Sequence, residues 1–335
     1  MAQQLTARHL PEIRAELAAW LDDNGPDGGP AAWSKGFETF DPATAQNERR
    51  AAKDWAVSLR AAELFFASKD MTELAVSAGL ALPAYRLHPE DLPAQHGLLL
   101  WETPATDSYE GGEFTGCPII GVSWAQRSRG VQIRTWCLRD DWVTFMAQGD
   151  QRAGLADLTA AQVRALYAQY PQQIVCMSRG FLPFGKVPGW LSDMPDDTSE
   201  MTLAELEDYA RSAGRQQQAE RALIVTWLLM GQTLSWGEDV PAPKSAVKAI
   251  RRLDSSLLLS ARYVRLRRSV PVGREAAPEG AGRSYQYRWL VRGHWRNAWY
   301  PSRQAHRPVW ISPHWKGPDG APVLDPEKLV NVLRR

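Results

Sequence analysis

The sequence has few cysteines and no long apolar run, and both absences narrow the class of protein. Its three cysteines, Cys117, Cys137 and Cys176, are an odd number without C-x-x-C spacing, which argues against a disulfide framework and a cysteine-based zinc site. The longest apolar stretch, residues 222–231, is about half the length that crosses a bilayer. The N-terminus lacks the basic start and apolar run of a signal peptide. We therefore expect a cytoplasmic protein without a membrane partner.

Motifs that hold cofactors or activate nucleophiles are also missing. The chain has no G-x-G-x-x-G between a strand and a helix, no G-x-x-x-x-G-K-[ST], no G-x-S-x-G and no H-E-x-x-H. The sequence HPED at 88–91 suggests the H-x-E of zinc deaminases, but no P-C-x-x-C follows it. The sequence therefore predicts neither a cofactor nor a metal site.

Charge is distributed unevenly along a chain of otherwise ordinary globular composition. Of its 335 residues, 44% are apolar and 23% are charged, which suffices for a large core and two or three domains. The net charge is only +1, yet residues 261–318 contain twelve Arg or Lys against two Glu, which leaves the remainder at −9. A basic end of this kind indicates a surface for a polyanion, or a surface that docks onto the acidic remainder.

The first hundred residues favour helices, and a sheet follows. Apolar positions three and four apart predict helices over residues 6–22 and 49–68, and Asp70 starts another in a capping pattern. We interpret residues 1–96 as a helical N-terminal region. Alternating apolar residues then predict a central antiparallel sheet in residues 97–150. Its expected strands are 97–103, 118–125 and 130–138, with 142–147 as a possible fourth.

Residues 151–260 again favour helices. Capping boxes predict helices over 159–170 and 202–234, and a proline start predicts another within 241–261. Residues 179–191 are rich in Pro and Gly and are expected to form a long ordered loop.

The last region, residues 261–335, is basic and alternates like strands. We expect one strand at 261–270, a second that begins at residue 287 and a third at 307–315. Residues 272–283 are expected to form a loop that joins the first two strands within one sheet. The predicted fold class is therefore α+β, with a helical N-terminal part, a central antiparallel sheet, a helical middle and a C-terminal basic antiparallel sheet.

The segment RWLVRGHWRNAWYPSRQAHRPVWISPHWKGPDGAP, residues 288–322, resembles the C-terminal end of uncharacterised proteins encoded on actinobacterial plasmids and phages. Weaker similarity extends over AELFFASKDMTELA, PEDLPAQHGLLLWETP and YVRLRR. The resemblance implies a mobile element of a high-GC bacterium as the source of the protein. It implies no activity.

Nucleic-acid binding through the basic sheet is the leading functional hypothesis, with DNA or RNA as the partner. Arginines spaced along a strand can reach successive phosphates, while tryptophans stack on bases. The predicted binding residues are Arg265, Arg267, Arg288, Arg292, Trp295, Arg296, Trp299, Arg303, Arg307 and Lys316. The competing interpretation is that these arginines pair with acidic groups of the helical part while the tryptophans fill a core.

Three alternatives remain open at this point. A metal-independent, toxin-like ribonuclease needs a base, an acid and cations, which His294, His306 and His314 could supply together with Arg292, Arg296 and Arg307. The same three histidines could instead bind zinc. A protein-interaction module that binds a host protein would use exposed tryptophans, for which the candidates are Trp190, Trp236, Trp299 and Trp315.

Overall fold

The structure, a computed structural model, describes most of the chain. The described residues are 5–24, 42–106, 117–147, 157–189, 215–267, 286–301, 304–318 and 320–323. They form an α+β protein with a helical N-terminal part, a central sheet and small C-terminal antiparallel sheets, as the sequence predicts. Among these residues, no helix is both long enough and apolar enough to cross a membrane.

Seven strands of the described chain form one mixed sheet, in the order β5-β4-β3-β2-β1-β7-β6. The strands are β1 (Glu63–Ala67), β2 (His96–Trp101), β3 (Gly121–Arg127), β4 (Gly130–Leu138), β5 (Ile174–Pro183), β6 (Ser235–Pro241) and β7 (Ser260–Leu266). The inner strand β1 runs parallel to both β2 and β7, whereas every other neighbouring pair is antiparallel. The predicted antiparallel strands β2, β3 and β4 are therefore part of a larger, mixed sheet. The sheet therefore takes strands from all four regions distinguished in the sequence.

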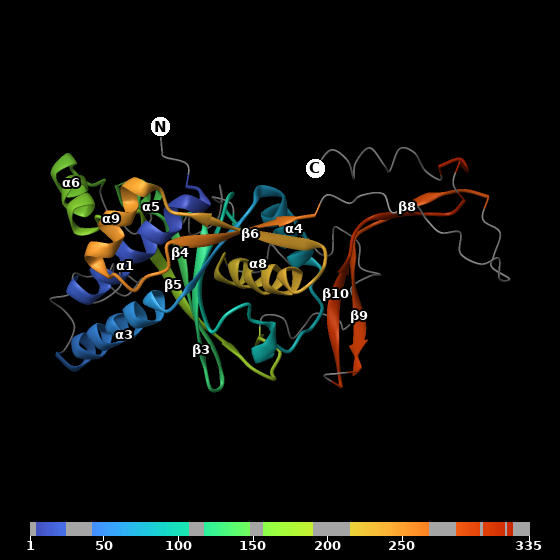
Figure 1. Cartoon of the computed structure of the whole chain (residues 1–335), viewed down its shortest axis with the longest axis horizontal. Helices are drawn as coiled ribbons and strands as arrows, with labels where there is room; N and C mark the ends of the chain where they lie inside the picture. Colours follow the sequence, from blue (N-terminus) through green and yellow to red (C-terminus); the bar gives the residue numbers. More distant parts are fainter. Residues whose placement is uncertain are drawn as a thin grey trace.

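Helices cover both faces of this sheet (Figure 1). On one face lie α1 (Leu10–Asn24), preceded by the short η1 (Ala7–His9), and α3 (Pro42–Arg60). On the other face lie α4 (Lys69–Leu80) and α8 (Arg215–Met230). Because both faces of the sheet are covered, β1 is apolar on both sides, and four of its five residues are buried.

Three smaller helices and one short turn also belong to the described part of the body. The helix α9 (Lys244–Leu253) packs on α1 through Ile250. The helices α5 (Arg139–Ala147) and α6 (Ala160–Gln169) form a side cluster with β4 and β5. The 3-10 turn η3 (Pro89–Asp91) lies between α4 and β2.

Local sequence signals explain where several helices lie. Leu10, Ile13, Leu17 and Leu21, spaced by three and four, are all fully buried against the sheet, so the predicted first helix is confirmed. The predicted capping box is confirmed as well, because the Thr159 hydroxyl accepts the Gln162 N–H at the start of α6.

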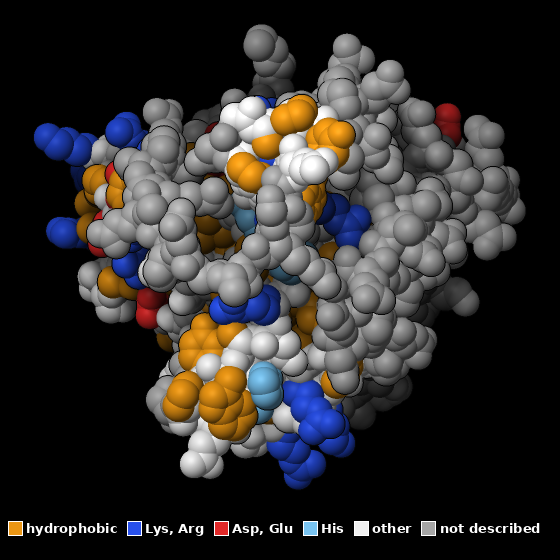
Figure 2. Space-filling model, turned by 90° about the vertical axis from the view of Figure 1, so that its right-hand side faces the viewer, with side chains coloured by type: hydrophobic (Ala, Val, Ile, Leu, Met, Phe, Trp, Pro, Cys, Tyr) orange, Lys and Arg blue, Asp and Glu red, His pale blue; other side chains and the backbone are white. Residues whose placement is uncertain are grey.

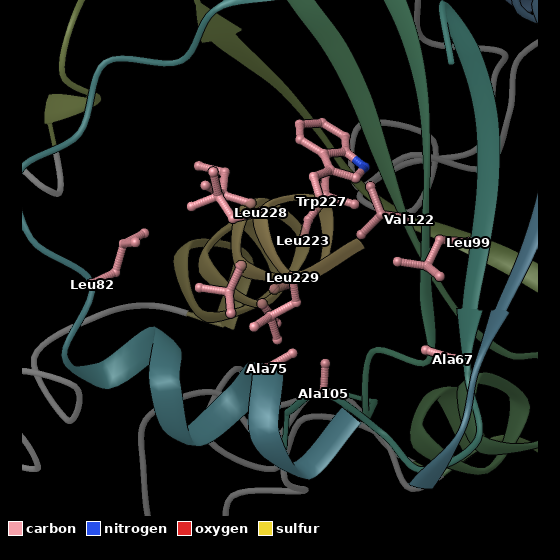
Figure 3. Packing of buried hydrophobic residues seen from close by; sticks show 14 of the residues in the cluster. Ala67, Ala75, Leu82, Leu99, Ala105, Val122, Leu223, Trp227, Leu228 and Leu229 are labelled. Atoms are coloured by element: carbon pink, nitrogen blue, oxygen red, sulfur yellow. The ribbon is translucent and has the colours of Figure 1, made fainter. Parts of the chain in front are cut away.

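The largest core cluster lies between the sheet and α8. Trp227 projects from this helix toward Val122 of β3, and Leu229 projects toward Ala75 of α4 (Figure 3). Trp227 meets Trp124 of β3 edge to face, with ring centroids 5.1 Å apart. The apolar run that the sequence places at 222–231 is thus a helix inside the protein.

Two small antiparallel sheets of two strands each follow the main sheet in the chain. One is the hairpin of β9 (His294–Tyr300) and β10 (Ala305–Ile311), and the other pairs β8 (Trp289–Val291) with β11 (His314–Lys316), the strands that flank this hairpin in the chain. Figure 1 shows β9 and β10 beside the end of the body that carries α4 and α8. The hairpin contacts the body through β10 and α8.

Five local predictions are wrong. The helix expected to start with a cap at Asp70 is capped instead by Ser68, whose hydroxyl accepts the Met71 N–H. The helix expected over 49–68 ends at Arg60, and the strand β1 follows, because ELFFA pairs on both sides within the sheet. Residues 142–147 belong to the helix α5 rather than to a strand. Within 179–191, the part up to Pro183 is the end of β5, which pairs with β4 instead of forming a loop.

The fifth wrong prediction concerns the C-terminal sheet. Residues 260–266 form β7, which lies between β1 and β6 in the main sheet and pairs with neither of the two small sheets. The predicted loop at 272–283 and residues 202–214 of the predicted helix lie outside the described residues.

Candidate nucleic-acid interface

The β9–β10 hairpin is anchored to the body by two tryptophans. Trp295 and Trp310 are directly paired across the hairpin, with ring centroids 5.3 Å apart, and are only 4% and 8% exposed. The Trp295 indole donates to the carbonyl of Ala78 in α4 at 2.8 Å. A side chain held in this way cannot stack on a base, so the binding role predicted for Trp295 is wrong.

The outer end of the same hairpin carries an exposed aromatic pair. Trp299 is four residues after Trp295, hence on the same strand face, but it is 52% exposed. The imidazole of His306 lies directly across from it, with ring centroids 5.0 Å apart. Arg296, on the other face of β9, is exposed. An aromatic surface and a cation are therefore available on one short hairpin.

The β8–β11 strand pair carries a second aromatic and cationic pair of this kind. Trp315 is 38% exposed, and the guanidinium of Arg288 lies 5.0 Å from its ring centroid. The neighbouring Lys316 is exposed, as is Arg292 at the end of β8. Figure 2 shows apolar, cationic and histidine side chains together on the face of the molecule that carries these two strand pairs.

Other predicted phosphate contacts have partners within the protein. Arg307 donates to the carboxylate of Asp91, whose side chain is 1% exposed. Arg265 lies over the Trp236 ring at 4.1 Å and contacts Glu238 at 3.5 Å. These arginines fit the competing interpretation, in which part of the positive charge is neutralised internally.

Arg267 lies beyond β7 and donates from Nε to the carbonyl of Ser235 at 3.2 Å, so it belongs to the main sheet rather than to the β9–β10 and β8–β11 strand pairs. Arg303 and Trp190 lie outside the described residues.

Two of the three histidines are brought together, and the third is not. The rings of His294 and His314 are 6.5 Å apart. Each Nδ1 bonds to the carbonyl two residues earlier, at 3.1 Å. Because a carbonyl only accepts, Nδ1 carries the proton in both rings, which leaves the Nε2 lone pair available in the neutral form.

His306 belongs to the opposite end of the hairpin. The register places it across from Trp299, five residues along β9 from His294, which is roughly 16 Å at the usual rise of a strand. Among the described residues, no group of three His, Cys, Asp or Glu side chains could hold a metal ion. The zinc hypothesis for the three histidines is therefore wrong.

Sequence reasoning missed a second cationic cluster, in the body. Arg127, Arg134 and Arg179, on β3, β4 and β5, line one cavity beside α3. The available signal was the alternation of Gln132 and Arg134 with the apolar Val131 and Ile133 in the sequence of β4. Comparisons of the chain with models of protein families, with characterised proteins and with solved structures find no match.

Proposed function

We propose that the protein binds nucleic acid, DNA or RNA, through the exposed side chains of its two C-terminal strand pairs, β9–β10 and β8–β11. One observation carries the proposal: Trp299 is 52% exposed and lies against His306, on the hairpin that also exposes Arg296. The resemblance to proteins of actinobacterial plasmids and phages supports a mobile element as the source.

The chemistry of this surface suits a single strand better than a duplex groove. An indole offers a flat face to any unpaired base, and such stacking is worth about 1–3 kcal/mol per base. Arg296 and Lys316 can neutralise phosphates and release counterions. Arg288 and Trp315 would add a second stacking position, because the guanidinium already lies over the indole.

A salt titration tests the proposal. We expect Arg296→Ala combined with Lys316→Ala to reduce the slope of log affinity against log salt by about 0.7 for each lost single-strand phosphate contact. Trp299→Ala should instead weaken binding by about tenfold at every salt concentration. The measurement is fluorescence anisotropy with labelled oligo(dT) and oligo(U).

The matched control removes two exposed arginines elsewhere, Arg164 of α6 and Arg251 of α9. We expect this control, with both residues changed to alanine, to bind like the wild type. If the wild-type protein binds no DNA or RNA at low salt, or if the control and the hairpin variant weaken equally, the proposal is refuted.

RNA cleavage is a second candidate function, favoured by the His294–His314 pair. Two imidazoles 6.5 Å apart can serve as base and acid on either side of a phosphate, with Arg296 on the same strand face as His294. We expect His294→Ala and His314→Ala each to abolish cleavage of a fluorogenic RNA while oligo(U) binding persists. His306→Ala is the control and should keep the activity. Intact RNA after incubation with the wild-type protein would remove this candidate.

A further inference from the structure

The outer face of α9 is a stripe of cations. Its basic residues are all exposed and recur at intervals of three and four, which places them along one side of the helix: Lys244, Lys248, Arg251 and Arg252. The opposite side carries Ala246 and Ile250, which are buried in the cluster that joins α9 to α1. We refer to the four basic residues as the α9 stripe.

Half of the α9 stripe is unfavourable for the helix that carries it. Lys248 has a like charge one turn away on either side, at Lys244 and at Arg252, and such pairs oppose helix formation. Lys244 also lies in the first turn, where the helix dipole disfavours a cation, and α9 contains no Asp or Glu. Only Arg251 and Arg252, in the last turn, are favourably placed along the dipole. The stripe therefore suits an anionic partner better than it suits the fold.

Exposed aliphatic side chains lie beside the end of the stripe. Leu253, the last residue of α9, is 49% exposed, and Leu258, in the segment that leads to β7, is 53% exposed. Val57 of α3, one turn before Arg60, is 63% exposed. An ion pair between Arg60 and Asp254, with Nε and Oδ2 3.6 Å apart, connects the end of α3 to the end of α9. The stripe and the three aliphatic residues therefore belong to one end of the molecule, and Figure 1 shows the β9–β10 hairpin at the other end.

We propose that this end of the protein binds the surface of a membrane that contains anionic phospholipids. Every Lys or Arg near such a surface adds to the attraction, and clusters of about four or more are typical of proteins that bind anionic headgroups. Aliphatic side chains strengthen the attachment by entering the boundary between headgroups and acyl chains. The sequence predicts no membrane partner because it has no long apolar run, but binding to a membrane surface does not require one.

The aliphatic residues favour lipid over the other anionic partners that a cationic stripe could bind. Nucleic acid would gain little from them, because bases are recognised by stacking on aromatic rings and by hydrogen bonds. A protein partner would favour aromatic residues and arginine in pockets, whereas Leu and Val are under-represented among the residues that dominate such interfaces. A lipid surface offers anionic headgroups to the cations and an apolar layer to the aliphatic side chains.

Co-sedimentation with lipid vesicles tests the proposal. The probes are vesicles of phosphatidylcholine alone and vesicles of phosphatidylcholine and phosphatidylglycerol in equal parts. We expect the protein to bind only the anionic vesicles, and to bind them less as salt is added, because salt screens the attraction. Lys248→Ala combined with Arg252→Ala should weaken this binding about 25-fold, which corresponds to about 1 kcal/mol for each cation removed. Leu253→Ala combined with Leu258→Ala should weaken it by about threefold or more.

The matched control removes one arginine and one lysine elsewhere on the surface, through Arg86→Ala combined with Lys186→Ala. This control should bind anionic vesicles like the wild type, and circular dichroism verifies that every variant is folded. The proposal is overturned if anionic vesicles bind no protein at low salt, or if either test variant binds them like the wild type. It is also overturned if the control weakens binding as much as the stripe variant, or if the stripe variant loses affinity for oligo(dT) instead of vesicles. These outcomes do not depend on whether the β9–β10 and β8–β11 strand pairs bind nucleic acid.

Discussion

Replacing Arg307 by alanine is expected to lower the free energy of unfolding by about 3–5 kcal/mol, the usual effect of removing one partner of a buried ion pair. The reason lies in Asp91, whose side chain is 1% exposed and accepts a hydrogen bond from Arg307. Its carboxylate also accepts from the Tyr85 hydroxyl at 2.7 Å and from the His88 N–H at 2.8 Å. Without Arg307, these two neutral donors would have to stabilise a buried negative charge alone.

A second substitution tests whether charge is the cause. Asp91→Asn removes the negative charge and keeps one acceptor oxygen, so it should destabilise the wild type by about 1–3 kcal/mol. In the Arg307→Ala background the same change should be neutral or stabilising, because no buried charge is left uncompensated. The coupling energy between the two sites is then at least about 1–3 kcal/mol, the difference between the two costs of Asp91→Asn.

Urea unfolding followed by circular dichroism measures all four proteins of this cycle. Arg296→Ala, which removes an exposed arginine from the same hairpin, is the control and should change stability by less than about 0.5 kcal/mol. Additivity of the two substitutions within about 0.5 kcal/mol would refute the reasoning, since independent sites behave in that way.

Three further predictions concern packing and pH. Trp295→Ala should destabilise the protein by about 3–5 kcal/mol because the indole is 4% exposed, whereas Trp299→Ala should change stability by less than about 0.5 kcal/mol. Equal effects of the two substitutions in thermal unfolding would contradict the role of Trp295 as the anchor of the hairpin. Gly97→Ala should cost about 1–3 kcal/mol in urea unfolding, because an added methyl group would overlap the Trp124 ring, and a neutral result would contradict this close approach. Burial lowers the pKa of His96 below its usual 6.5, so the unfolded chain binds the proton more readily and stability falls as the pH drops through 6.5. The variant His96→Gln should lose this part of the pH dependence of the urea midpoint. Identical pH profiles of the variant and the wild type would contradict the prediction.

Elements with strong local signals could be predicted from the sequence. The first helix follows from apolar residues at spacings of three and four, and α6 follows from its capping box. The β3–β4 hairpin follows from two alternating runs around a polar turn, and the structure confirms it with a register that closes at Arg127 and Gly130. Each of these signals lies within a few residues of the element that it specifies.

Elements that depend on distant partners were not predictable. The run ELFFA continues the apolar character of the preceding helix, and no periodicity distinguishes a short buried strand from a helical turn. It becomes a strand because β2 and β7 pair with it on either side. Likewise, nothing in residues 260–266 indicates that they pair with β1 rather than with the basic segment that follows them.

The candidate site was only partly predictable for the same reason. The sequence identifies the segment rich in Arg, His and Trp, but it does not distinguish the buried Trp295 from the exposed Trp299 four residues later. The partner of Arg307 is 216 residues away along the chain, so its internal neutralisation could not be anticipated. Side-chain exposure and ion pairing are properties of the assembled fold.

The position of β1 has a consequence for biosynthesis. Phe65, Phe66 and Ala67 pair with residues of β7 almost two hundred positions downstream. At ordinary translation speed a ribosome needs roughly 10–40 s to synthesise the residues between β1 and β7. Throughout this time one edge of β1 has no strand to pair with. An unpaired strand edge can pair with other extended chains, so we expect chaperones to bind the nascent polypeptide until residue 266 has emerged from the ribosome.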